Sequence, residues 1–148
     1  MNHPLGALRS IETADGSLSL HSAHFDEAFH SSAGALAEAE AKFVRPAELE
    51  RFAQLKELQV LDVCFGLGYN SAAVMRAMPE TAPPRMIWWG LELDRRPLEK
   101  AMDHQPFCDL WPSAVRKRFD QLQHKGSWND SGGKGTMLWG DARCNLNE

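Results

Sequence analysis

The sequence predicts an α/β protein, a Rossmann-like fold in which helices cover both faces of a parallel sheet. Three apolar segments, residues 58–65, 85–94 and 136–140, have the pattern of strands, the first of them buried, and helical stretches alternate with them. The first strand leads into two closely spaced glycines and then a helix, an order that usually holds a nucleotide-like ligand. We therefore divide the chain into an amino-terminal lead-in, residues 1–58, and an α/β ligand-binding domain, residues 59–148.

The lead-in predicts several small elements. Residues 13–22 contain an Asp-Gly turn signal and then alternate apolar with polar residues, which predicts an edge strand or a hairpin. Residues 33–43 are rich in Ala and Glu and predict a helix, which Ser31 or Ser32 could cap. Pro46 suits the first position of a second helix.

The remainder of the chain alternates strands with helices. A helix over about 69–78 follows the glycine turn, and Pro97 begins another after the second strand. Pro112 begins a third helix, in which apolar residues recur at helical spacing. Residues 125–135 are rich in glycine and predict a flexible loop before the third strand.

The composition limits the classes of function. The chain has 148 residues, 43% of them hydrophobic, and a net charge of -4, which does not favour a general nucleic-acid binder. Its three cysteines are scattered and form no C-x-x-C pair, which favours reduced thiols and a cytoplasmic location. His21, His24 and His30 lie close together in sequence, but no second acidic or cysteine cluster completes a set of metal ligands, so we expect no metal.

Acidic residues at the ends of the predicted strands indicate the kind of ligand. Gly66 and Gly68 permit a tight turn and the close approach of a ligand to the backbone. Asp62, just before them, would repel the pyrophosphate of a dinucleotide but attract the ammonium and sulfonium of S-adenosyl-L-methionine. Glu92 ends the second strand at about the spacing expected of a ribose ligand. Asp141 follows the third strand and could accept a hydrogen bond from the adenine amino group.

Alternative roles for these residues stay open. Acidic residues often cap a strand end or the next helix, and Asp94 competes with Glu92 for the ribose. Ser71 stands where a dinucleotide-binding pattern has its third glycine. Two further classes remain: a nicotinamide- or flavin-binding oxidoreductase with an altered glycine pattern, which Asp62 and Ser71 disfavour, and a non-catalytic remnant or interaction module of the same fold.

Several segments resemble a known family. "VLDVCFGLGYNSA", "GLELD" and "GDAR" are similar to the first three motifs of class I S-adenosylmethionine-dependent methyltransferases. "DGSLSLHSAHFDEAFHSSAGALAEAEAKFV" is similar to the lead-in of MnmC-like methyltransferases, and the resemblance extends from about Thr13 to Arg143. Cys64 stands where most methyltransferases have glycine, as is typical of the MnmC-like family, and is expected to be a small buried residue.

The resemblance implies a reaction, a partner and a set of cofactor-binding residues. MnmC-like methyltransferases methylate the aminomethyl group of a modified wobble uridine, which makes tRNA the expected partner. A basic helix surface at Arg116, Lys117 and Arg118 could contact tRNA phosphates or be simply a solvated face. The implied cofactor-binding residues are Asp62, Cys64, Phe65, Gly66, Gly68, Asn70, Glu92, Leu93, Asp141 and Ala142, with weaker support for His30 and Ser31, which a helix cap would explain equally well.

The resemblance also predicts that the fold is incomplete, with residues 59–148 as the first half of the S-adenosylmethionine-binding α/β domain. The family's next motif, an acidic residue followed by proline and an aromatic residue after a fourth strand, has no counterpart before Glu148. We therefore expect a sheet truncated after its third strand, with an unpaired edge and an exposed apolar face that favour self-association. The catalytic residues would lie outside this sequence, and the chain alone is expected not to methylate tRNA.

Overall fold

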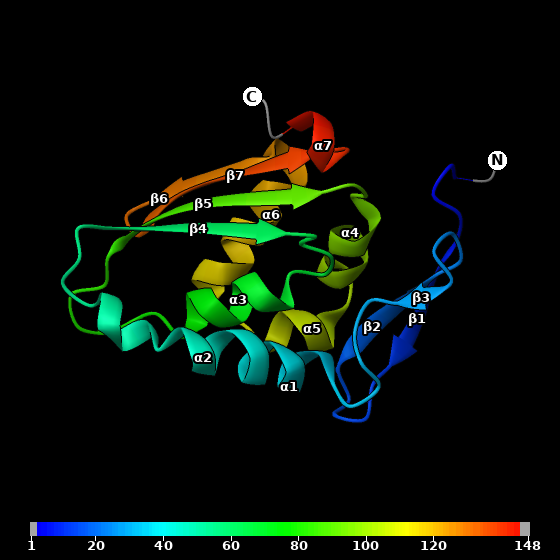
Figure 1. The fold of residues 1–148 in the computed structure, drawn as a ribbon, viewed down its shortest axis with the longest axis horizontal. Helices are drawn as coiled ribbons and strands as arrows, with labels where there is room; N and C mark the ends of the chain where they lie inside the picture. Colours follow the sequence, from blue (N-terminus) through cyan, green and yellow to red (C-terminus); the bar gives the residue numbers. More distant parts are fainter. Residues whose placement is uncertain (1–2, 146–148) are drawn as a thin grey trace.

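A four-stranded sheet forms the centre of the computed structural model, which describes residues 3–145 (Figure 1). Its strands are β4 (Glu57–Val63), β5 (Arg85–Glu92), β7 (Gly133–Trp139) and β6 (Ser127–Asp130), and they lie in the order β4-β5-β7-β6. The first three are parallel to one another, and β6 is antiparallel to β7. The predicted α/β class with a mainly parallel sheet is therefore confirmed.

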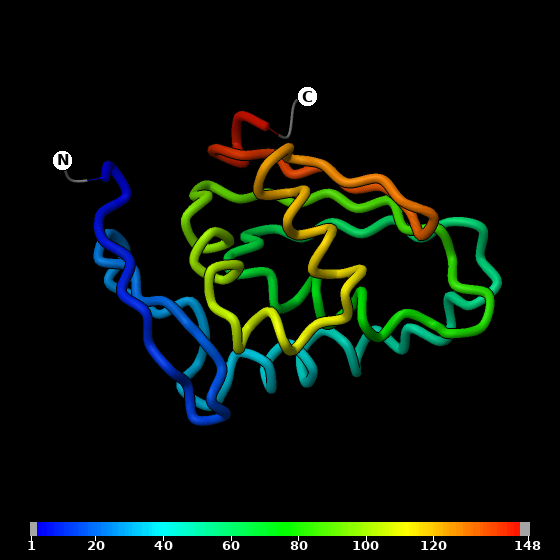
Figure 2. The backbone as a smooth tube through the Cα atoms, turned by 180° about the vertical axis from the view of Figure 1, so that it is seen from behind, coloured from blue at the N-terminus to red at the C-terminus, as the bar shows by residue number. Residues whose placement is uncertain are grey.

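The helices that connect these strands pack together on one side of the sheet (Figures 1 and 2). They are α3 (Tyr69–Arg76), α4 (Arg96–Met102), α5 (Gln105–Asp109) and α6 (Ser113–Lys125), and Figure 2 shows α6 crossing in front of the sheet. As predicted, prolines open α4 and α6. The largest fully buried side chains in this core are Trp88, Tyr69, Phe107, Phe119, Leu20, Leu67, Met86, Leu98 and Leu122.

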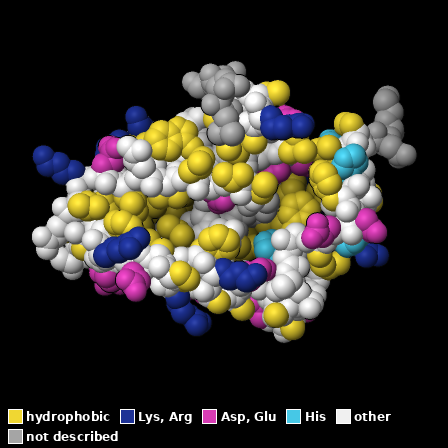
Figure 3. Space-filling model, viewed as in Figure 1, with side chains coloured by type: hydrophobic (Ala, Val, Ile, Leu, Met, Phe, Trp, Pro, Cys, Tyr) yellow, Lys and Arg dark blue, Asp and Glu magenta, His cyan; other side chains and the backbone are white. Residues whose placement is uncertain are grey.

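Within residues 3–145, the opposite face of the sheet is exposed along β4 and only partly exposed at β5, where Ile87 and Leu91 are buried. Leu61 and Val63 of β4 are 58% and 55% exposed, and Trp89 of β5 is 36% exposed. Figure 3 shows hydrophobic side chains gathered over the strands. The prediction of a buried first strand is therefore wrong, because β4 is an edge strand with one exposed face. The prediction of helices on both faces is also wrong for this part of the chain. The chain advances in one direction from β4 to β5 to β7, so right-handed crossovers place every connecting helix on the same face.

The lead-in forms a small antiparallel sheet beside the carboxyl ends of the central strands (Figures 1 and 2). It contains β1 (Leu8–Glu12), β2 (Leu18–Ser22) and β3 (Glu27–Ala28) in that order. The predicted hairpin is β1–β2, and its turn includes Gly16, whose φ is 79°. The small sheet of the lead-in therefore lies at the end of the central sheet where ligands bind in folds of this type.

One helical segment follows the small sheet, instead of the two helices predicted. It runs through α1 (Ala35–Ala39), the π-helical turn η1 (Glu40–Val44) and α2 (Arg45–Ala47), and the 3₁₀ turn η2 (Leu49–Phe52) comes next. Pro46 lies near the end of this segment rather than at the start of a new helix. A proline has no N–H and clashes with the carbonyl four residues earlier, and the wider π-helical turn just before Pro46 accommodates that defect.

Two residues of the hairpin turn cap the first helix, in place of the predicted Ser31 or Ser32. The Ser17 hydroxyl accepts a hydrogen bond from the Ala35 N–H at 3.0 Å, and the Asp15 carboxylate accepts one from Ala37 at 3.0 Å. Gly34 is the N-cap residue of this helix and has no side chain that could accept a hydrogen bond. A Cβ at Gly34 would lie 2.2 Å from Asp15 Oδ2, so glycine is required there for the carboxylate to reach the helix.

Residues 125–135 form most of a β-hairpin, not the predicted flexible loop. The strands β6 and β7 pair in antiparallel register from Ser127↔Thr136 to Asp130↔Gly133. Two of the glycines make room for neighbours: a Cβ at Gly135 would lie 2.0 Å from Trp128 Nε1, and one at Gly133 would lie 2.0 Å from the Met86 carbonyl oxygen. The glycine content therefore reflects close packing rather than flexibility.

Candidate cofactor-binding site

The glycine turn between β4 and α3 has left-handed backbone conformations at three positions. The φ angles of Cys64, Gly66 and Gly68 are 62°, 60° and 92°. The N–H groups of Cys64 and Phe65 both donate to the Leu91 carbonyl oxygen, at 2.9 and 3.2 Å. The turn is therefore attached to the carboxyl end of β5, which brings the ends of the first two strands together.

The two glycines of the turn have different surroundings. A Cβ at Gly68 would lie 2.6 Å from the rings of both Phe119 and Phe65, so the space beside Gly68 belongs to the core. A Cβ at Gly66 would lie 3.3 Å from Phe29 Cδ1 and would make no closer contact. The sequence alone attributed a close approach of ligand to both positions; in the structure, Gly68 is required for packing, and only Gly66 lies under the amino-terminal sheet.

Cys64 is exposed, so the prediction of a small buried residue is wrong. Partial burial of the sulfur, with the nearby charges of Glu92 and Asp62, raises the pKa of the Cys64 thiol above its ordinary value. The positive φ explains why glycine suits this position, since a residue with a Cβ is strained there. Cys64 is the residue of the turn that carries this strain.

Asp62 and Ser71 form a buried polar link behind the turn. The Ser71 hydroxyl donates to Asp62 Oδ2 at 2.5 Å and accepts a hydrogen bond from Trp88 Nε1 at 2.9 Å. Burial raises the pKa of the Asp62 carboxyl, and the neighbouring charge of Glu92 adds to the rise. Ser71, which replaces the third glycine of a dinucleotide pattern, therefore fixes the orientation of the carboxylate that makes the site acidic. Sequence reasoning missed this contact because Trp88 comes from another strand.

Glu92 lies at the tip of β5 with its carboxylate held by two backbone groups. Its Oε2 accepts the Gly66 N–H at 2.7 Å, and its Oε1 accepts the Asp94 N–H at 2.9 Å. Burial raises the pKa of the Glu92 carboxyl, and the two N–H donors counteract the rise. Asp94 instead pairs with Arg96 in the following turn. Between the two rivals for the ribose, the structure thus places Glu92, not Asp94, against the glycine turn.

The end of β7 lies beside Glu92, but the Asp141 side chain is already engaged. The Gly140 N–H donates to the Glu92 carbonyl oxygen at 2.9 Å. The Asp141 carboxylate accepts hydrogen bonds from the guanidinium and the backbone N–H of Arg143, which lower its pKa to about 2. Ala142 begins the short helix α7 (Ala142–Asn145). Three N–H donors of Arg143 therefore occupy most of the acceptor capacity that Asp141 would offer to adenine.

The small sheet places His30 near the start of α3. The His30 ring lies edge-on to Tyr69 at a centroid distance of 5.3 Å, and its Nδ1 lies 3.0 Å from the Ser19 hydroxyl. Burial lowers the pKa of His30 despite the opposing charges of Glu38 and Asp15, which favours the neutral ring. Ser31 is exposed, and its backbone N–H donates to the Glu38 carboxylate. The structure therefore gives His30 a place near the turn, whereas Ser31 anchors the adjoining helix.

Three other candidate residues differ in their accessibility. Phe65 is buried in the core against Trp88 and Phe119, with ring centroids 5.6 and 5.3 Å away, so its side chain is not available to a ligand. Leu93 is 46% exposed just after Glu92. Asn70 lines a cavity of about 500 Å³ between β4, α3 and the segment 43–52, which Asp62 also lines. This largely apolar cavity lies beside the strand-end residues and does not include Glu92.

The predicted basic surface on α6 is partly used within the fold. Arg118 donates to the Asp130 carboxylate at 2.8 and 2.9 Å and lies over the Trp128 ring at 4.1 Å. Arg116 and Lys117 are exposed. The helix surface therefore offers fewer free cations than its sequence suggests. No helix among residues 3–145 is long and apolar enough to cross a membrane.

The fold and the strand-end site define an α/β protein with a Rossmann-like, MnmC-like architecture. The structure is similar to the crystal structure of MnmC2 from Aquifex aeolicus, with a TM-score of 0.74 and 29% identity. The match covers 99% of this chain and 47% of the MnmC2 chain. The uncharacterized protein MJ0670 of Methanocaldococcus jannaschii is 40% identical over 65 residues, which are 44% of this chain and 17% of that protein. No family model matches the chain. The chain thus spans about half the length of the solved structure it matches.

Proposed function

We propose that this chain is the cofactor-binding part of an S-adenosyl-L-methionine-dependent methyltransferase of the MnmC kind. The observation that carries the proposal is the Glu92 carboxylate, which the N–H groups of Gly66 and Asp94 hold at the strand tip beside the glycine turn. The charge of Glu92 reaches the Asp62 carboxyl, so one buried and one partly buried acidic group lie close to the same turn. The match to MnmC2 supports the same assignment.

The charge of this site suits a cationic cofactor. S-adenosyl-L-methionine carries an ammonium and a sulfonium and has no phosphate, so carboxylates attract it, whereas they would repel the pyrophosphate of NAD or FAD. Asp62 and the Gly66 turn would hold the methionine end. Each oxygen of Glu92 accepts one backbone N–H, which leaves further lone pairs for the ribose hydroxyls. The acidic character of the strand ends therefore favours a methyltransferase over an oxidoreductase.

The proposed reaction is a direct methyl transfer to tRNA. Bound S-adenosyl-L-methionine would supply the methyl group: the amine nitrogen of an aminomethyl group on a modified wobble uridine would attack the methyl carbon, and the carbon–sulfur bond would break with the electron pair left on sulfur as a thioether. The amine then releases a proton to solvent. Such a displacement depends on the alignment of the two reactants. The residues of this chain supply one side of that alignment by fixing the cofactor.

The proposal includes a negative part: this chain alone does not methylate tRNA. β4 is an edge strand, and Leu61 and Val63 on its outer face are more than half exposed. These side chains stay exposed in the described part of the chain, and an acceptor base needs a wall that holds it in line with the sulfonium. Incubation of the purified chain with labelled S-adenosyl-L-methionine and tRNA bearing the aminomethyl base should give no transfer, and turnover near one per second would contradict this part.

Thermal unfolding tests the cofactor assignment. S-adenosylhomocysteine at a hundred times its Kd should add about 2.7 kcal/mol of stability, which raises the Tm of a domain this size by roughly 5–10 °C. NAD at the same concentration should leave the Tm unchanged. Glu92→Gln is the matched control, since it keeps the side-chain shape but removes the charge. A larger shift with NAD than with S-adenosylhomocysteine would favour the oxidoreductase, and no shift with either would favour a non-catalytic module.

A further inference from the structure

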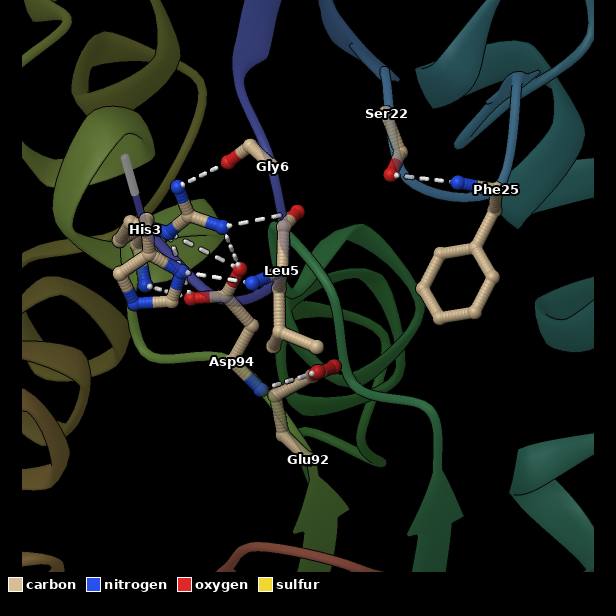
Figure 4. Close-up of polar contacts among 8 residues, drawn as sticks. His3, Leu5, Gly6, Ser22, Phe25, Glu92 and Asp94 are labelled. Carbon is tan, nitrogen blue, oxygen red and sulfur yellow. Dashed lines mark hydrogen bonds and ion pairs between the residues drawn. The ribbon is translucent and has the colours of Figure 1, made fainter. Parts of the chain in front are cut away.

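Residues 3–6 lie against the turn that follows β5, where the Arg96 side chain binds two of their carbonyl groups. Arg96 Nη1 donates to the Gly6 carbonyl oxygen at 2.7 Å, and Arg96 Nη2 lies 3.4 Å from the Leu5 carbonyl oxygen. Figure 4 shows His3, Leu5 and Gly6 gathered above Asp94 and Glu92 at the tip of the strand. These contacts join residues about 90 positions apart in sequence, so they fix the amino-terminal segment relative to the central sheet.

The same guanidinium also fixes Asp94. Arg96 Nε donates to both oxygens of the Asp94 carboxylate at 3.0 Å, and Nη2 donates to Oδ2 at 2.6 Å. The side chains of Arg96 and Asp94 are only 22% and 11% exposed, so water competes weakly for these bonds. Against the raising effect of partial burial, the hydrogen bonds from Arg96 lower the pKa of Asp94. The carboxylate is therefore charged and in a fixed position at pH 7.

Asp94 in turn holds Glu92. The backbone N–H of Asp94 donates to Glu92 Oε1 at 2.9 Å, while the Asp94 side chain is bound to Arg96. The position of the Glu92 carboxylate therefore depends on a turn that the Arg96 guanidinium stabilises together with the backbone N–H of Arg96, which donates to Asp94 Oδ1 at 3.0 Å. A hydrogen-bond acceptor that must bind two neighbouring hydroxyls works only if it is fixed to within about half an ångström.

We propose that Arg96 is a positioning residue for ribose recognition, acting through Asp94 on Glu92 and through the Leu5 and Gly6 carbonyls on the adjoining wall of the site. This inference rests on the proposed function. Arg96 need not touch the ligand, because both of its effects pass through backbone groups that it orders. Its loss should therefore reduce the selectivity of the site for ribose hydroxyls more than it reduces folding stability.

Calorimetric titration of the full chain with two ligands tests the proposal. The ligands are S-adenosylhomocysteine and its 2′-deoxyribose analogue, and the wild-type chain should prefer the former by about tenfold, as one hydrogen bond to a charged acceptor implies. In Arg96→Met that preference should fall at least threefold. Arg96→Lys can reach a carbonyl but lacks the forked guanidinium, so its preference for S-adenosylhomocysteine should lie between those of the wild type and Arg96→Met. Lys100→Met on the same helix is the control and should keep the wild-type preference.

The outcomes separate this inference from the function on which it rests. If Arg96→Met keeps the same preference as the wild-type chain, the inference is overturned and the cofactor assignment stays intact. The same holds if the wild-type chain binds both ligands equally well. Failure of the wild-type chain to bind S-adenosylhomocysteine would overturn both. If Arg96→Met does not fold, Arg96→Lys decides: a preference equal to that of the wild type contradicts the proposal.

Discussion

Gly68→Ala should destabilise the fold strongly, whereas the same change at Gly16 should not. The two glycines have similar backbone conformations, with φ of 92° at Gly68 and 79° at Gly16. They differ in surroundings: a Cβ at Gly68 would lie 2.6 Å from the rings of Phe119 and Phe65, and one at Gly16 would meet no atom within 4 Å. The comparison therefore isolates the packing contribution at the glycine turn.

The magnitudes follow from those two observations. A left-handed backbone costs an alanine about 1–2 kcal/mol, and this cost applies to both variants. Overpacking adds about 1–3 kcal/mol at Gly68 alone, because two buried aromatic rings must shift. The entropy that the unfolded chain loses on gaining a Cβ is the same at both sites and cancels in the difference. Gly68→Ala should thus lose about 2–5 kcal/mol and Gly16→Ala about 1–2 kcal/mol.

Urea denaturation of both variants and of the wild-type chain measures these free energies, provided the slope of each unfolding curve stays unchanged. Gly66→Ala is a useful third variant, because its Cβ would lie 3.3 Å from the partly buried Phe29 side chain, which would need to move by only a few tenths of an ångström. The stability lost in Gly66→Ala should be close to that lost in Gly16→Ala. Equal losses at Gly68 and Gly16 would refute the conclusion that Gly68 serves the core.

Three further changes have defined outcomes. Cys64→Gly should raise the free energy of unfolding by about 1 kcal/mol, because it removes a Cβ from a position with φ of 62°. Asp15→Ala should lower the free energy of unfolding by about 1 kcal/mol, because a helix cap is lost. Slight burial raises the pKa of Asp15, but hydrogen bonds lower it to about 2 from 3.8. The stabilisation by Asp15 is therefore present above pH 3.8 and disappears as the pH falls toward 2. The double change Leu61→Lys with Val63→Lys should reduce any self-association, since both side chains are more than half exposed.

Each of these predictions has a direct check. Urea unfolding compares Cys64→Gly with the wild type, and a loss of stability would show that the thiol makes contacts worth more than the strain. Unfolding of Asp15→Ala at a series of pH values should converge with the wild type in acid; a constant gap would contradict the titration argument. Sedimentation velocity measures the association state, with Gln59→Lys on the same face of β4 as the control that adds charge without removing apolar surface.

Local sequence signals were sufficient for the three parallel strands, the glycine turn and the helices that begin near Pro97 and Pro112. Asp62 and Glu92 end adjacent parallel strands, so their proximity follows from the order of elements alone. Their roles in binding stay predictions. The Ser71 hydroxyl, which links Asp62 to Trp88, could not be found in this way, because the contact depends on where a side chain of β5 points after folding.

The errors have physical causes that a single sequence does not reveal. Whether β4 is central or an edge strand depends on strand order, and the alternating exposure of its residues appears only in the folded sheet. The glycines before β7 resemble those of a flexible loop, yet they are needed because Trp128 and Met86 lie against them. The continuous helix through Pro46 required a π-helical turn, for which the sequence has no recognised signal.

Calorimetric titration of S-adenosylhomocysteine into the wild-type chain and into Glu92→Ala tests the central claim most directly. We predict measurable binding by the wild type and a loss of about 1–3 kcal/mol in the variant, the value of a lost hydrogen bond to a charged group. Urea unfolding of the variant confirms that it remains folded at the titration temperature. Equal affinity of the wild type and a folded Glu92→Ala, or no binding by the wild type, would contradict the assignment of a cofactor site to the strand ends.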